Sequence, residues 1–115
     1  MHRLENYDPD GTLRDKCEST SVSTLISVIR DMEDLAKYYT NTSGMKGVTS
    51  KIIFEGNRDF LNQIDDKNKL YEFIFPDGEI EYMILTRKQY VEELARLKEI
   101  HGKKIKSMDI GKYLS

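Results

Sequence analysis

Residues 69–85 read KLYEFIFPDGEIEYMIL, two runs rich in β-branched and aromatic residues on either side of Pro76-Asp77-Gly78. Proline presets the backbone torsion φ of the first turn position, and aspartate tolerates the second. Glycine accepts the left-handed conformation that strains other residues. The stretch therefore predicts a β-hairpin at the centre of the fold.

The length of the hairpin loop decides which side chains share a face of the sheet. The first strand carries three aromatic residues, Tyr71, Phe73 and Phe75. A two-residue loop would group them with Ile80, Tyr82 and Ile84. A three-residue loop, a type I turn with Gly78 in the bulge position, groups them instead with Glu79, Glu81 and Met83. Turn chemistry favours the three-residue loop because proline suits the first turn position.

Aromatic residues interleaved with carboxylates on a half-open sheet are typical of a protein-binding surface. The alternative is that these aromatic residues fill the core on both sides of the sheet. The residues that we expect to bind a partner protein are Tyr71, Phe73, Phe75, Glu79 and Glu81.

Apolar residues at three- and four-residue spacing predict an amphipathic helix that starts at Ser19–Ser21 and is ended by Asn41–Gly44. They predict another from a Thr86–Gln89 capping box to about Gly102. A strand over 51–55 and a two-turn helix after Asn57 lie between them. The predicted fold class is α+β, a small, mostly antiparallel three-stranded sheet with a central hairpin in the order α-β-α-β-β-α. The two amphipathic helices pack on this sheet. We find no repeat in the sequence.

This order divides the chain into three parts. We expect a polar N-terminal arm over residues 1–18, a single α+β domain over 19–102, and a basic C-terminal tail over 103–115 that can dock on the domain.

The composition indicates a folded cytoplasmic protein, with 38% hydrophobic and 33% charged residues and no apolar run long enough to span a bilayer. A single cysteine, Cys17, makes no internal disulfide. With it and only two histidines, His2 and His101, a site of nitrogen and sulfur ligands would need residues far apart in sequence. We therefore expect no metal site and no cofactor.

The net charge of −2 conceals an uneven distribution along the chain. Residues 1–85 hold 10 Lys/Arg and 16 Asp/Glu, whereas residues 86–115 hold 8 and 4. This bipolar pattern and an open sheet edge are compatible with a homodimer and equally with a monomer. The basic end also suggests an alternative function, nucleic-acid binding, although glutamates interrupt its basic stripe. The residues of this alternative are Arg96, Lys103, Lys104 and Lys106.

The segment Asp8-Pro-Asp-Gly-Thr-Leu-Arg-Asp15 resembles the first motif of the haloacid dehalogenase phosphohydrolases. The resemblance implies a nucleophile at Asp8 and an acid/base at Asp10, at the end of a buried parallel strand. Arg3–Tyr7 has no apolar strand pattern, and the chain is short for a doubly wound sheet. A tight polar turn accounts for the segment with fewer assumptions, and we predict no catalytic residues.

Taken together, the sequence predicts a small non-enzymatic regulator or adaptor that binds another protein of unknown identity. We expect it to bind no membrane. On its small size, its lack of motifs and its high charge, we consider it an accessory factor of phage or mobile-element type that modulates a host protein.

Overall fold

The computed structural model describes residues 1–38 and 47–114. These residues form a mixed α+β structure with two three-stranded antiparallel sheets, three α-helices and one 3₁₀ helix. They fall into two compact units, which we name unit 1 (Met1–Gly56 with Tyr113–Ser115) and unit 2 (Asn57–Lys112). The boundary lies inside the range 19–102, over which the sequence predicts a single domain. No helix in the described ranges is long and apolar enough to cross a membrane.

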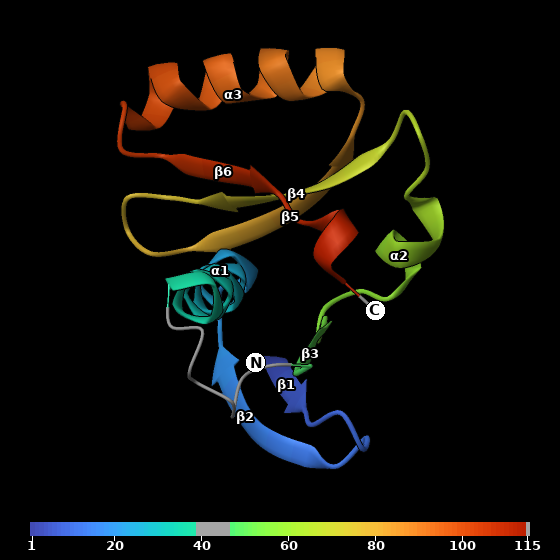
Figure 1. The fold of residues 1–115 in the computed structure, drawn as a ribbon. Coiled ribbons are helices and arrows are strands. Elements are labelled where there is room, and N and C mark those ends of the chain that lie inside the picture. Colours follow the sequence, from blue (N-terminus) through green and yellow to red (C-terminus); the bar gives the residue numbers. More distant parts are fainter. Residues whose placement is uncertain (39–46, 115) are drawn as a thin grey trace. The chain divides into compact units, whose positions relative to one another are not determined.

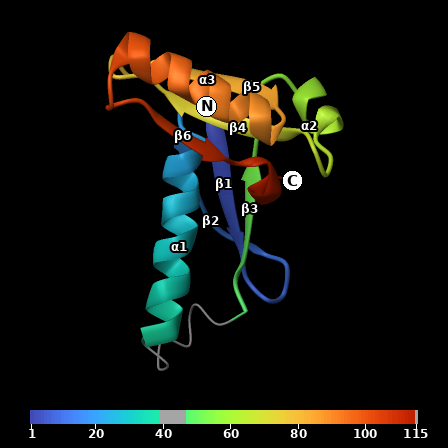
Figure 2. The same cartoon turned by 90° about the horizontal axis from the view of Figure 1, so that it is seen from above.

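Unit 1 has a sheet in the order β2-β1-β3, and Figure 2 shows the helix α1 running alongside its strands. Along β1 the side chains of His2, Leu4 and Asn6 are buried, and the residues between them are half-buried. Asn6 links the three strands, because its Nδ2 donates to Asp15 Oδ1 and its Oδ1 accepts from Ser50 Oγ, both at 2.7 Å. The bounds are β1 His2–Tyr7, β2 Leu13–Ser19, α1 Val22–Tyr38 and β3 Thr49–Ile53.

Unit 2 has a sheet in the order β5-β4-β6, and Figure 1 shows the helix α3 lying over these strands. A capping box fixes the start of α3, as the sequence predicts: Gln89 N donates to Thr86 Oγ1 at 3.2 Å, and Thr86 N donates to Gln89 Oε1 at 2.9 Å. The bounds are α2 Asp59–Gln63, β4 Lys69–Ile74, β5 Ile80–Leu85, α3 Arg87–His101 and β6 Lys106–Asp109. The 3₁₀ helix η1, Gly111–Tyr113, begins in unit 2 and ends with the first residue that returns to unit 1.

The hairpin of unit 2 has the three-residue loop that its turn chemistry favours. Phe75 N donates to Glu79 O at 2.8 Å, and Gly78 N donates to Phe75 O at 2.9 Å. The pairing then runs from Ile74 opposite Ile80 to Lys69 opposite Leu85. Tyr71, Phe73 and Phe75 therefore share a face with Met83 and the two glutamates, as predicted.

The two units repeat one topology, although no repeat is visible in the sequence as a whole. Each has a central strand, a hairpin partner, a helix, and a third strand on the other side of the central one. Both hairpins turn on the same tripeptide, Pro-Asp-Gly, at 9–11 and at 76–78. The hydrogen bonds of the first turn, Asp8 N to Thr12 O at 2.9 Å and Gly11 N to Asp8 O at 2.8 Å, match those of the second. The chain is therefore a tandem of two ββαβ units.

The predicted order of elements was wrong at both ends of the chain. Residues 1–18, expected as a polar arm, form β1 and most of β2, and part of the expected tail forms β6, which pairs with β4. The reason is that every residue of β2 is exposed or half-buried, so an edge strand of this kind needs no apolar pattern. The predicted end of the first helix at Asn41–Gly44 lies outside the described residues.

Candidate functional site

The aromatic face of the unit 2 hairpin is core and not an open surface. Tyr71 and Phe73 are 4% and 0% exposed and cluster with Leu97 and Ile105. The ring of Tyr90 on α3 stacks on Tyr71 with 4.0 Å between centroids. The prediction that these two residues lie on a half-open face was therefore wrong, because α3 covers that face. Glu79 and Glu81 are exposed, and Phe75 is half-buried at the edge of the cluster.

Phe75 lies instead beside the lysines that the sequence assigned to nucleic acid. These residues line a surface hollow of about 500 Å³, which we name the turn hollow. Apolar atoms come from the hairpin and positive charges from the segment after α3, and no carboxylate is among the lining residues. The lining residues are Ile74, Phe75, Pro76, Gly78, Lys103, Lys104 and Lys106.

The end of α3 explains how the lysines reach the hairpin. Gly102 has φ +83°, a left-handed conformation that suits glycine, and its N–H donates to Lys98 O at 2.9 Å. The chain reverses there, and Ile105 is buried in the aromatic cluster while Lys104 and Lys106 on either side of it are exposed. In β6, Lys106 pairs with Ile74. His101 packs edge-on against Phe75, with 5.0 Å between ring centroids.

Arg96, the fourth residue of the nucleic-acid alternative, does not line the turn hollow. Its guanidinium forms a salt bridge with Glu93 one turn earlier in α3. The hydrogen bond and charge of Glu93 raise the pKa of Arg96, and the charge of Glu81 acts in the same direction. The carboxylate of Glu93 therefore balances the charge of Arg96, and the structure separates this residue from the three lysines.

A second hollow, of about 530 Å³, lies at the start of α3. It carries charges of both signs, since Asp66 and Asp109 accompany four cationic residues. Burial raises the pKa of the Tyr71 hydroxyl there, and the charge of Asp109 adds to this effect. The lining residues are Asp66, Lys67, Lys69, Tyr71, Thr86, Arg87, Lys88 and Asp109.

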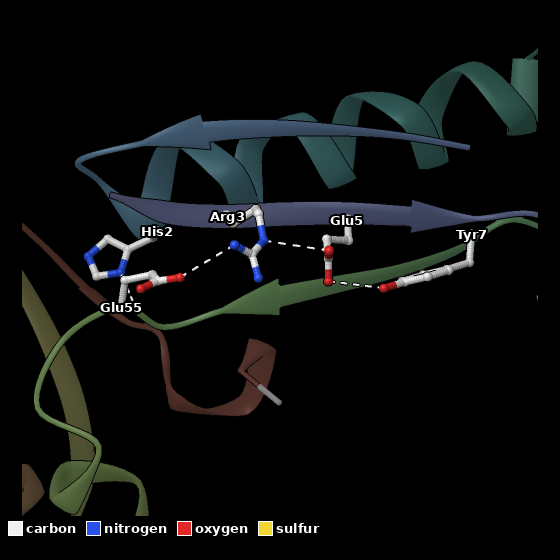
Figure 3. A network of polar contacts seen from close by, with 5 residues as sticks. All are labelled: His2, Arg3, Glu5, Tyr7 and Glu55. Atoms are coloured by element: carbon white, nitrogen blue, oxygen red, sulfur yellow. Dashed lines mark hydrogen bonds and ion pairs between the residues drawn. The ribbon is translucent and has the colours of Figure 1, made fainter. Parts of the chain in front are cut away.

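The half-buried side chains of β1 in unit 1 form a polar row that ends at Glu55 (Figure 3). Tyr7 donates to Glu5 at 3.0 Å, and this hydrogen bond is the largest cause that raises the pKa of Tyr7. Arg3 forms ion pairs with Glu5 at 3.5 Å and with Glu55 at 3.6 Å. The contact of its Nε with Glu5 lacks hydrogen-bond alignment. We did not predict this row from the sequence; its signal is a charged or hydroxyl residue at every second position from Arg3 to Tyr7.

His2 closes the same end of the row. Its Nδ1 accepts a hydrogen bond from the backbone N–H of Glu55 at 2.9 Å, and its ring stacks on Phe54 with 4.9 Å between centroids. Since Nδ1 is an acceptor, the neutral ring carries its proton on Nε2. These contacts fix the start of β1 to the end of β3.

The Asp8-Pro-Asp-Gly segment is a hairpin turn, as the tight-turn interpretation predicts. Asp10 Oδ1 accepts from Thr12 N at 2.9 Å. A hydrogen bond with the Thr12 side chain, and then this backbone contact, lower the pKa of Asp10. Asp8 lies 3.7 Å from Arg14. Over residues 1–38 and 47–114, no three or more His, Cys, Asp or Glu side chains are grouped so that they could hold a metal ion.

Comparison with known proteins found no relative of this chain. No protein-family model, no curated protein and no solved structure matches this chain. We therefore infer the function from the geometry of the described residues.

Proposed function

We propose that this protein is a cytoplasmic, non-enzymatic regulator or adaptor that binds another protein through the turn hollow. Its ligand is an acidic segment of the partner that carries one apolar side chain. The observation that supports this proposal is the joining of Phe75 and Ile74 with Lys103, Lys104 and Lys106 around one hollow. An apolar floor with a rim of one charge is complementary to a side chain flanked by carboxylates.

The position of the carboxylates near the hollow sets the orientation of the ligand. Asp77 lies in the turn, where its Oδ1 accepts from Glu79 N at 2.9 Å, and Glu79 is exposed. An acidic segment that approached over these two residues would be repelled. We therefore place the acidic residues of the ligand over the lysines and its apolar residue over Phe75.

Fluorescence anisotropy tests the proposal directly. The probe is a labelled peptide with one phenylalanine between runs of glutamate and aspartate. Two matched peptides replace the phenylalanine by alanine or the acidic residues by lysine. We expect saturable binding of the first peptide alone, weakening as salt is raised, because screening acts on exposed charges.

Charge reversal locates the site. The double variant Lys103→Glu with Lys104→Glu should weaken peptide binding by about tenfold or more, which corresponds to about 1.4 kcal/mol. The matched control, Lys88→Glu with Lys98→Glu, makes the same charge change on α3 outside the turn hollow and should retain most of the affinity. Equal losses in both variants would show a general charge effect and refute the assignment of the site.

Nucleic acid is the second candidate ligand, because lysines beside an aromatic ring are also typical of single-strand binding sites. The salt bridge of Arg96 with Glu93 argues against it, since it leaves three clustered lysines in place of an extended stripe. A labelled single-stranded oligonucleotide in the same assay separates the two functions. Tighter binding of the oligonucleotide than of the peptide, lost on reversal of Lys103 and Lys104, would replace the proposed function with this one.

A further inference from the structure

In the part of the chain that the structure describes, no strand lies along the outer edge of β2. In the sheet order β2-β1-β3, β2 pairs with β1 on one side, and no described strand pairs with its other side. Its first six residues are exposed and the last is half-buried. By contrast, five of the six residues of β5, the edge strand at the equivalent position in unit 2, are half-buried. A row of unpaired backbone N–H and C=O groups of this kind is a template for a further strand.

The charges of β2 identify which strand fits. The strand reads LRDKCES over residues 13–19, with both signs present. Two antiparallel copies related by a two-fold axis at Cys17 place Lys16 of each copy opposite Glu18 of the other. An axis at Lys16 would oppose two lysines, and an axis at Glu18 would oppose two glutamates. Since opposite charges directly across a strand pair stabilise it and like charges destabilise it, the axis at Cys17 is favoured.

We propose that two copies of this chain associate edge to edge through β2, antiparallel, with Cys17 on the two-fold axis. The occupant of the open edge is thus a second copy of the same strand. The two unit 1 sheets then form one continuous six-stranded sheet. This contact is independent of the turn hollow, which lies in unit 2.

The register brings the two Cys17 side chains together on one face of the joined sheet. Cys17 pairs with Leu4 inside the chain and is exposed. Directly opposite residues of an antiparallel pair have Cβ atoms about 4.5–5.5 Å apart, close to the separation of a disulfide. Burial, with a smaller contribution from Asp15, raises the pKa of the Cys17 thiol, so cross-linking is carried out at mildly alkaline pH.

Cross-linking of the full chain tests the register. Diamide takes up the two electrons and two protons that two thiols lose when they form a disulfide. We expect rapid covalent dimer from the natural protein. The matched variant Cys17→Ser with Ser19→Cys keeps one thiol on the same strand face. Its thiols lie four residues apart along the pair, about 13 Å, and should not cross-link. Equal cross-linking of both proteins would overturn the register.

Sedimentation equilibrium without oxidant tests the association itself. We expect a reversible dimer that Lys16→Glu weakens by at least tenfold, because it opposes two glutamates. The swap Lys16→Glu with Glu18→Lys should restore the dimer. These residues also lie opposite Glu5 and Arg3 of β1, so circular dichroism must confirm that each variant is folded. A natural protein that stays monomeric at hundreds of micromolar would overturn the proposal, as would a swap that leaves the dimer broken.

Discussion

Gly11 and Gly78 hold the same position in two hairpin turns of the same sequence, with φ of +87° and +92°. In each turn the aspartate side chain accepts a hydrogen bond from the backbone N–H two residues later, at 2.9 Å in both cases. The two glycines thus mark equivalent points of the two ββαβ units. This relationship is the clearest trace that the tandem topology leaves in the sequence.

Alanine at either glycine should destabilise the protein through backbone strain alone. A Cβ at Gly11 or Gly78 would meet no atom within 4 Å, so steric clash contributes nothing. We expect Gly78→Ala to lower the free energy of unfolding by about 1–3 kcal/mol, and Gly11→Ala by a similar amount. Urea denaturation measures both. Gly78→Asn should cost less, because asparagine tolerates positive φ, and an asparagine variant as unstable as the alanine one would contradict this explanation.

Truncation of Phe73 should reduce stability and not merely binding. Its side chain is fully buried beside Leu97 and Ile105, so Phe73→Ala leaves a cavity in the core of unit 2. We expect a loss of about 3–5 kcal/mol in the free energy of unfolding. The control Val91→Ala, at a side chain that is 53% exposed on α3, should change stability by about 0.5 kcal/mol or less. A melting temperature unchanged by Phe73→Ala would contradict its burial and support the prediction that the aromatic face is exposed.

Asp65 should make stability depend on pH in the acidic range. Its Oδ1 accepts from Asn68 N at 2.7 Å and Lys67 N at 2.8 Å, and these hydrogen bonds lower its pKa below the ordinary 3.8. A carboxyl with a lowered folded-state pKa stabilises the fold above its unfolded-state pKa, and this contribution is lost as pH falls through the folded-state pKa. Asp65→Asn keeps an oxygen acceptor but does not titrate. Its stability should therefore fall less than that of the natural protein as the pH is lowered below about 4. Chemical denaturation at a series of pH values gives the two slopes, and parallel slopes would rule out this role.

Removal of the negative charge beside the turn hollow should strengthen peptide binding. Glu79 is exposed and adjacent to Gly78, which lines the hollow. We expect Glu79→Gln to raise the affinity for the acidic peptide about two- to fivefold, since exposed charge pairs are worth about 0.2–1 kcal/mol. Anisotropy titration at low salt measures the change. A gain that persists at high salt would show that the effect is not electrostatic.

The central hairpin was predictable because its determinants are local. Pro76 and Gly78 select the turn, and the turn selects the register of every pair from Ile74–Ile80 to Lys69–Leu85. The capping box at Thr86 and Gln89 is equally local. The elements that pack on the hairpin, α3 and β6, come later in the chain. The burial of Phe73 could therefore not be predicted from the hairpin segment alone.

The hairpin of β1 and β2 was not predicted because its strands are polar. In β1 the buried positions are occupied by His2 and Asn6 as well as Leu4, and their hydrogen bonds replace apolar burial. The signal that could have found it is the second Pro-Asp-Gly tripeptide at 9–11. The turn hollow was predictable only in parts, since Phe75 and the lysines were each noticed but their approach depends on the chain reversal at Gly102.

The proposed function requires the turn hollow to receive an acidic segment of a partner protein. Titration of the ¹⁵N-labelled protein with the acidic phenylalanine peptide, followed by two-dimensional ¹H–¹⁵N NMR, shows where the peptide binds. We expect the largest shift changes on Ile74, Phe75, Gly78 and the backbone amides of residues 103–106. Changes centred on the hollow at the start of α3 or on β2, or no changes at millimolar peptide, would refute the proposed function.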